Sequence, residues 1–215
     1  MENMQSVAVE ARSLIRRTRF AALATLDRGE GTPFASLVAV ATAGDCAPLL
    51  FLSALARHTR NLRADPRASL LVTDRPGDDP LAAARLTVSG TLVECEDSSA
   101  LARYLARHPE ARGYADFHDF RLYRLEPVAA HLIAGFGRIM SLARDHLLLD
   151  ADVSRSIGAV EERVLASIAS LPGGPKIIGV DAEGYEFTDD AGVGHRRFGV
   201  PVATEAELCV ALRDQ

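Results

Sequence analysis

The chain has 215 residues, of which 48% are hydrophobic and 25% charged, and its formal net charge is −5. This composition is typical of a folded globular protein and argues against an intrinsically disordered chain. The negative net charge argues against a nucleic-acid binder with an overall basic surface, and no apolar run approaches the length of a membrane span.

The cysteines indicate the compartment. Cys46, Cys95 and Cys209 are odd in number, far apart and without metal-ligand spacing, so we expect reduced thiols. The N-terminal residues lack the apolar core of a signal peptide. We therefore expect a cytoplasmic protein that binds neither nucleic acid nor membranes.

The first two-thirds of the chain predicts a helix followed by short strands. Residues 6–17 have the periodicity of a helix, with Arg12 and Arg16 off its apolar face. Short apolar runs broken by tight turns then predict strands over 20–26, 33–42, 48–53, 68–74 and 85–94. This rhythm is typical of an antiparallel meander rather than of βαβ units.

Two helices and a long strand complete this part. Residues 57–65 predict a short helix that ends before Pro66, and 97–107 predict a second helix with Asp97 as its N-cap. Residues 75–84 read as a loop, and Gly90 suggests a bulge or a close backbone approach. A long strand is expected over 119–132, continuing to about 138.

The last third of the chain has a different sequence pattern, with a longer run of helical periodicity than the first two-thirds. Apolar residues recur at spacings of three and four over 153–171, which predicts an amphipathic helix that ends at PGGP (172–175). A hairpin is expected over 176–188, and Thr204 with Glu207 forms a capping box that opens a final helix. We place one domain over 1–146 and a second over 147–215.

Arg57, His58, Thr59 and Asn61, with Ser53 just upstream, form the strongest candidate binding site. They stand at a strand-to-helix junction, where cationic groups, hydroxyls and free backbone N–H groups can converge on a phosphate. The alternative is a solvated charged turn, and spacing alone leaves both open.

Three further residues are weaker candidates. Arg85 opens a strand after the loop and could bind a ligand bidentately, while Phe136 and Arg138 lie in the glycine-bearing segment GFGR. A strand-end surface arginine and a bulged strand end are the alternatives. We expect no metal site, because the histidines show no metal-ligand spacing and a polar strand start explains Asp116, His118 and Asp119 better.

Several ordered stretches carry a resemblance to a known family. They are PFASLVAVA (33–41), LFLSALARHTRNLRADPRASLLVTD (50–74), DPLAAARLTVSG (79–90), RHPEARGYADFHDFRLYRLEP (107–127) and AGFGR (134–138). Together they resemble the pyridoxamine 5′-phosphate oxidase-like split-barrel superfamily, and within it the haem-utilisation branch. The resemblance implies an α+β protein, with a six-stranded antiparallel split barrel followed by a small α+β domain. It also implies a homodimer that holds FMN at its interface.

The resemblance also assigns residues. Arg57 and His58 fall where the oxidases carry an Arg-Lys pair for the FMN phosphate, followed here by Thr59. Ser36 replaces a further phosphate-binding arginine. Arg85 falls where the oxidases have a glutamine against the flavin ring, and Phe136 and Arg138 could reach the site from the neighbouring chain.

These features leave more than one function open. The first is an FMN-dependent oxidoreductase acting on a small-molecule redox substrate, with no catalytic residue identified. The second is a haem-binding or haem-handling protein with His195 or His131 as axial ligand, although the helix at 161–170 lacks the histidine pattern often found in this branch. The third is a non-catalytic flavin module, or one that uses a deazaflavin.

Overall fold

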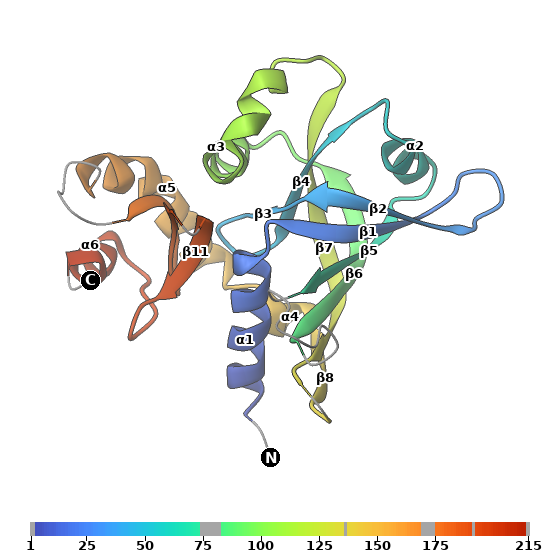
Figure 1. Ribbon diagram of the computed structural model, residues 1–215. Helices are drawn as coiled ribbons and strands as arrows, with labels where there is room; N and C mark the ends of the chain where they lie inside the picture. Colours follow the sequence, from blue (N-terminus) through green and yellow to red (C-terminus); the bar gives the residue numbers. More distant parts are fainter. Residues whose placement is uncertain (1–2, 74–82, 136, 169–174, 191, 214–215) are drawn as a thin grey trace.

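The computed structural model describes residues 3–73, 83–135, 137–168, 175–190 and 192–213 (Figure 1). Its helices are α1 (Met4–Arg17), α2 (Arg57–Ala64), α3 (Ser98–Arg107), the 3-10 helix η1 (Pro109–Tyr114), α4 (Arg144–Leu147), α5 (Ala151–Ile168) and α6 (Glu205–Arg213). Its larger sheet contains β1 (Phe20–Leu26), β2 (Pro33–Ala39), β3 (Ala41–Thr42), β4 (Pro48–Ser53), β5 (Arg67–Thr73), β6 (Arg85–Glu94), β7 (Phe120–Ile133) and β8 (Ile139–Ala143). Its smaller sheet contains β9 (Lys176–Asp181), β10 (Gly184–Asp189) and β11 (Gly192–Arg197).

The larger sheet closes on itself because one strand bends. Its order is β2-β1-β5-β6-β7-β4-β3, with β8 added beside β7, and every pairing is antiparallel. The first and last strands of this path, β2 and β3, are consecutive in the chain and are separated only by Val40. Counted as one bent strand, they close a six-stranded barrel, which confirms the predicted fold class.

The bend at Val40 corrects the expectation of one unbroken strand over 33–42. The Val40 carbonyl accepts hydrogen bonds from Arg107 Nε at 3.0 Å and lies 2.9 Å from His108 Nε2. The Val40 N–H donates to the carbonyl of Arg19 at 2.9 Å. Because side chains from α3 and backbone next to α1 take these bonds, the strand changes partner from β1 to β4 at this residue.

The described residues form three hydrophobic clusters. The first lies inside the barrel and includes the apolar face of α1, with Leu14 and Ile15 fully buried against strand residues such as Leu86. The second lies beneath α3 and η1 and contains Phe51 and Tyr104. The third belongs to residues 151–213, which we call the C-terminal module; the division at 146/147 stays a prediction.

Local signals predicted several boundaries correctly. Asp97 caps α3 by accepting from Ser99 N at 2.8 Å. Thr204 and Glu207 form the predicted capping box, with Glu207 N donating to Thr204 Oγ1 at 3.3 Å. The predicted hairpin is β9–β10. Most of the predicted 75–84 loop and the PGGP segment lie outside the described residues.

Other elements were not predicted. They are β3 as a separate strand, η1, β8, α4 and β11. Arg12 and Arg16, which the helical pattern places off the apolar face, are 3% and 0% exposed. None of the described helices is both long enough and apolar enough to cross a lipid bilayer.

Gly90 is the predicted irregularity in β6. The register between β6 and β7 shifts between Ser89 and Gly90. A Cβ at Gly90 would lie 2.1 Å from the carbonyl oxygen of Glu126 and 2.9 Å from Pro127 Cα. Both atoms belong to backbone, so neither can move aside cheaply. Glycine is therefore required for the two strands to approach here.

We expect Gly90→Ala to lower the free energy of unfolding by about 1–3 kcal/mol or more, because the added methyl group must push β7 away. Urea denaturation measures the effect. Gly113→Ala is the matched control, since a Cβ there meets nothing within 4 Å. Equal stability of the two variants would show that the close approach at Gly90 is not needed.

Candidate functional site

The predicted phosphate site lies at the first turn of α2. Its N-cap residue is Ala56, which offers no side-chain hydrogen bond to the helix, whereas α1 and α3 are capped by Asn3 and Asp97. The first turn of α2 therefore lacks a side-chain acceptor of the kind that caps the other two helices. The backbone N–H groups of this turn donate to no side-chain cap, and together with the helix dipole they favour binding of an anion.

Arg57 is already engaged in this structure. Its Nε and Nη2 donate to Asp27 Oδ2 at 3.0 and 2.7 Å, and its guanidinium lies 4.7 Å from the centre of the Phe34 ring. This contact holds the pKa of the Asp27 carboxyl below its ordinary value. An anionic ligand would have to compete with Asp27 for Arg57.

Ser36 and His58 are brought together as the resemblance implies. Ser36 Oγ lies 3.0 Å from His58 Nδ1, although 22 residues separate them in sequence. Burial lowers the pKa of His58, so its imidazole is neutral at neutral pH. A neutral imidazole gives a phosphate a hydrogen bond but no positive charge, and Ser36 adds none.

Thr59 and Asn61 are both 1% exposed. The Thr59 hydroxyl has no hydrogen-bond partner among the described residues. Asn61 instead has a structural role: its side chain accepts from Arg28 N at 3.3 Å and donates to Thr25 Oγ1 at 3.1 Å. It fixes α2 against the end of β1.

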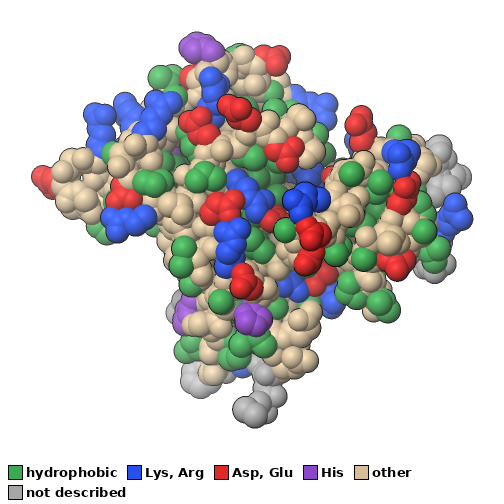
Figure 2. All heavy atoms as spheres, turned by 180° about the vertical axis from the view of Figure 1, so that it is seen from behind, with side chains coloured by type: hydrophobic (Ala, Val, Ile, Leu, Met, Phe, Trp, Pro, Cys, Tyr) green, Lys and Arg blue, Asp and Glu red, His purple; other side chains and the backbone are tan. Residues whose placement is uncertain are grey.

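A polar pocket of about 260 Å³ opens beside this turn. It is lined by Asp27, Arg28, Gly29, Arg57, Arg60 and Asn61. Figure 2 shows basic side chains gathered at this corner of the molecule, near the loop that joins β1 and β2; they are arginines, since the one lysine of the sequence is Lys176 on β9. Ser53 is turned to a different contact, since its Oγ donates to Asp119 Oδ2 at 2.6 Å.

Arg85 and Arg138 lie at one end of the β6–β7–β8 ladder. Arg85 is opposite Ile133, which is also opposite Ile139, the residue after Arg138. Arg85 donates to the carbonyl of Ala83 at 3.5 Å, and Arg138 donates to Glu10 on α1 at 2.9 Å. Phe136 lies outside the described residues.

An uncharged face of the barrel sheet was not predicted. Two adjacent cross-strand rows run over its outer side, and most of their side chains are exposed. The rows are Leu37–Ala22–Leu71–Thr87–His131–Ser141 and Ala35–Ala24–Ser69–Ser89–Ala129–Ala143. We call these twelve residues the uncharged face. The sequence could have revealed this face only through the register of the strand pairs, and β8, which was not predicted, supplies two of its residues.

His131 is the histidine of this face. Its side chain is exposed, and its Nδ1 lies 3.3 Å from Ser141 Oγ. This contact leaves Nε2 as the nitrogen that can coordinate a metal. His195, the other predicted axial ligand, has a side chain only 1% exposed and lies 3.6 Å from Asp181, so it is not presented to a surface ligand.

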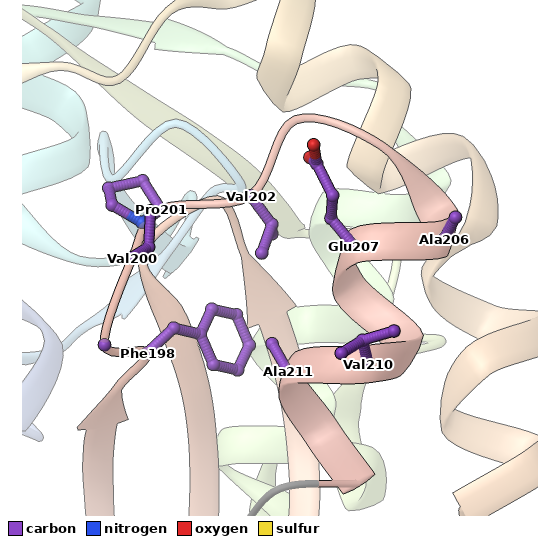
Figure 3. A pocket seen from close by; sticks show the side chains of 9 residues that line it. Phe198, Val200, Pro201, Val202, Ala206, Glu207, Val210 and Ala211 are labelled. Atoms are coloured by element: carbon purple, nitrogen blue, oxygen red, sulfur yellow. The ribbon is translucent and has the colours of Figure 1, made fainter.

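A further cavity of about 680 Å³ lies in the C-terminal module. Figure 3 shows it between the segment after β11 and α6, with Phe198 and Ala211 on one side and Val202 and Glu207 on another. Its lining is mostly apolar. It contains none of the predicted cofactor residues.

The barrel and the site together define a split-barrel protein, and comparisons with known proteins name the family. Residues 2–146 match the CREG β-barrel family, so the chain belongs to this family. Its fold is the pyridoxamine 5′-phosphate oxidase-like split barrel that the sequence resembles.

Three relatives are similar over different lengths. Atu2129 of Agrobacterium tumefaciens, a protein of unknown function, has a TM-score of 0.86 and 26% identity, covering 98% of this chain and 95% of that one. A heme binding protein from Mycobacterium smegmatis has a TM-score of 0.64 and 29% identity, covering 100% and 96%. The chloroplastic heme oxygenase HOZ of Arabidopsis thaliana is 39% identical over 109 residues, which span 49% of this chain but only 33% of that protein.

Proposed function

We propose that this protein binds and handles haem. The observation that carries the proposal is its 29% identity, over the whole chain, to a protein described as heme binding. The 39% identity to a heme oxygenase over 109 residues of this chain supports the same ligand. Haem therefore takes the place of FMN as the leading cofactor, although FMN stays a second proposal.

The uncharged face offers a place for the ligand. A porphyrin is a flat, largely apolar ring, and small uncharged side chains let such a ring lie close to a sheet. His131 supplies an exposed imidazole within this face, and the Ser141 contact orients it. Arg85, two residues before Thr87 on the same strand, is a cation placed to meet a haem carboxylate.

We expect His131→Ala to weaken haem binding by at least roughly tenfold. Removing a residue that only hydrogen-bonds to a metal ligand already lowers metal affinity by about that factor, so removing the ligand itself should cost at least as much. The measurement is titration with haemin, followed by the Soret absorbance. His118→Ala is the matched control, since His118 is also exposed but lies outside the uncharged face. If both variants bind haem as the wild type does, His131 is not the ligand.

We further propose that the uncharged face pairs with a second copy of the chain. Leu37 is 75% exposed and Leu71 39% exposed on this face, and burying them against a twofold partner would remove apolar surface from water. A cofactor on the face would then be enclosed between two subunits.

Leu37→Glu should convert the dimer to a monomer, because it places a charge in the paired surface. Sedimentation equilibrium gives the mass. Leu55→Glu is the control: Leu55 is 76% exposed but lies in the turn before α2, so this variant should remain dimeric. A wild-type protein that is monomeric at all concentrations would contradict the proposal.

FMN binding at α2 is the second proposal. The specific observation in its favour is the first turn of α2, which has no side-chain cap. Arg57 and His58 lie in this turn, as does Thr59, whose buried hydroxyl has no hydrogen-bond partner in the described part of the chain. Such a site would suit an FMN-dependent oxidoreductase, a flavin module without catalysis, or a deazaflavin phosphate.

The double variant Arg57→Ala, His58→Ala should weaken FMN binding well over tenfold, since a hydrogen bond from a charged group to phosphate contributes about 1.5–3 kcal/mol. Quenching of flavin fluorescence measures the affinity. Arg67→Ala, which removes an exposed arginine bound to Asp65, serves as control. Unchanged retention in the double variant would remove this site.

A further inference from the structure

The C-terminal module meets the barrel through buried charges. Arginines from α1 and α3 face carboxylates from α5 and the β9–β10 hairpin. The pairs are Arg12–Glu183, Arg16–Asp181, Arg16–Glu183, Arg103–Glu161 and Arg107–Glu186. Each of these side chains is at most 10% exposed. Four cations of the barrel part are therefore matched by four anions of the module.

The hairpin turn is the centre of this contact. Arg12 donates to both carboxylate oxygens of Glu183, at 2.9 and 2.5 Å, and Arg16 Nη1 donates to Glu183 Oε2 at 2.9 Å. Asp181 accepts from the backbone N–H of Glu183 at 2.8 Å, which holds the turn in shape. Although burial opposes it, Arg16 keeps the pKa of Asp181 well below its ordinary value, so this carboxylate stays charged.

None of the hydrophobic clusters formed by the described residues spans this junction. The two clusters of the barrel part contain no residue beyond Leu148, and the cluster of the module begins at Val153. A cleft of about 420 Å³ also opens between α3 and α5. It is lined by small residues of α3 such as Ala102 and Ala106, and by Gly158 of α5, while Arg103 and Glu161 also line it. The junction is thus neither apolar nor fully packed.

We propose that the module is a releasable unit, held on the barrel by these charge pairs and able to detach while both parts stay folded. Buried ion pairs lose much of their attraction to the cost of dehydration, but they impose one geometry. Detachment opens the four carboxylates and the arginine groups that face them to water, and it leaves each hydrophobic cluster intact. The junction therefore fixes the orientation of the module on the barrel but still allows the module to detach.

The test removes one charge and keeps its shape. In Glu183→Gln, Arg12 and Arg16 lose their shared carboxylate but remain buried as long as the module is docked. Detachment relieves them, so the detached fraction should rise by at least roughly 100-fold. Glu205→Gln is the control, because the Glu205–Arg163 pair is exposed and lies within the module.

Limited trypsin digestion of the full-length chain reads out this fraction, since cleavage of a transiently opened state follows its population. We expect cleavage after Arg144 and after Arg155, the two arginines that flank the junction, to accelerate by about 100-fold in Glu183→Gln and by less than about twofold in the control. The two fragments should then resist further digestion. Unchanged cleavage, or equal acceleration at sites throughout the chain, would overturn the proposal, the latter because it signals global unfolding.

A milder variant keeps the test valid if Glu183→Gln does not fold. Thr42 on β3 donates its hydroxyl to Glu186 of the module at 2.6 Å. Thr42→Val removes this bond to a charged group and leaves every ion pair in place. Cleavage of the same segment should accelerate by roughly tenfold or more. No acceleration at this segment would count against a junction held by polar contacts.

Discussion

The guanidinium of Arg107 joins three parts of the chain at one buried point. Its Nε donates to the carbonyl of Val40, where the bent strand leaves β1 for β4. Its Nη2 donates to the carbonyls of Arg16 and Thr18, which end α1, and its Nη1 donates to Glu186 in the C-terminal module. One side chain, only 1% exposed, therefore helps to close the barrel, to position α1 and to hold the C-terminal module in place.

The barrel has two surfaces that differ in charge and exposure: one is uncharged and exposed, and the other carries buried arginines. The apolar side chains of α1 belong to the interior cluster, and on the outer side of β1, β2, β5, β6, β7 and β8 most side chains of the two cross-strand rows are exposed. That side carries the uncharged face with His131, whereas the side near α1 and α3 carries the buried arginines. A flat apolar ligand and a second subunit suit the first surface, and an acidic hairpin suits the second. The proposed ligand site and the module thus occupy different parts of the barrel.

Local patterns predicted the longer helices and most strands, because alternation, periodicity and caps act between residues close in sequence, but they did not predict η1 and α4. The capping box at Thr204 is one example. The break at Val40 could not be predicted this way, since its cause is Arg107, 67 residues away. Arg12 and Arg16 were misjudged for the same reason: the carboxylates that make their burial possible lie more than 160 residues further on. The resemblance assigned Ser36 and His58 to one site, and the two side chains lie 3.0 Å apart. It did not predict the Asp27–Arg57 pair, which depends on how the β1–β2 loop folds.

Haem binding can be measured directly by the visible absorbance of the purified protein. We expect a Soret band, either in the protein as isolated or after addition of one equivalent of haemin, and we expect this band to be retained through gel filtration. The absence of a Soret band, together with complete separation of haemin from the protein on the column, would show that the protein does not bind haem. Flavin bands in the protein as isolated would instead favour the α2 site.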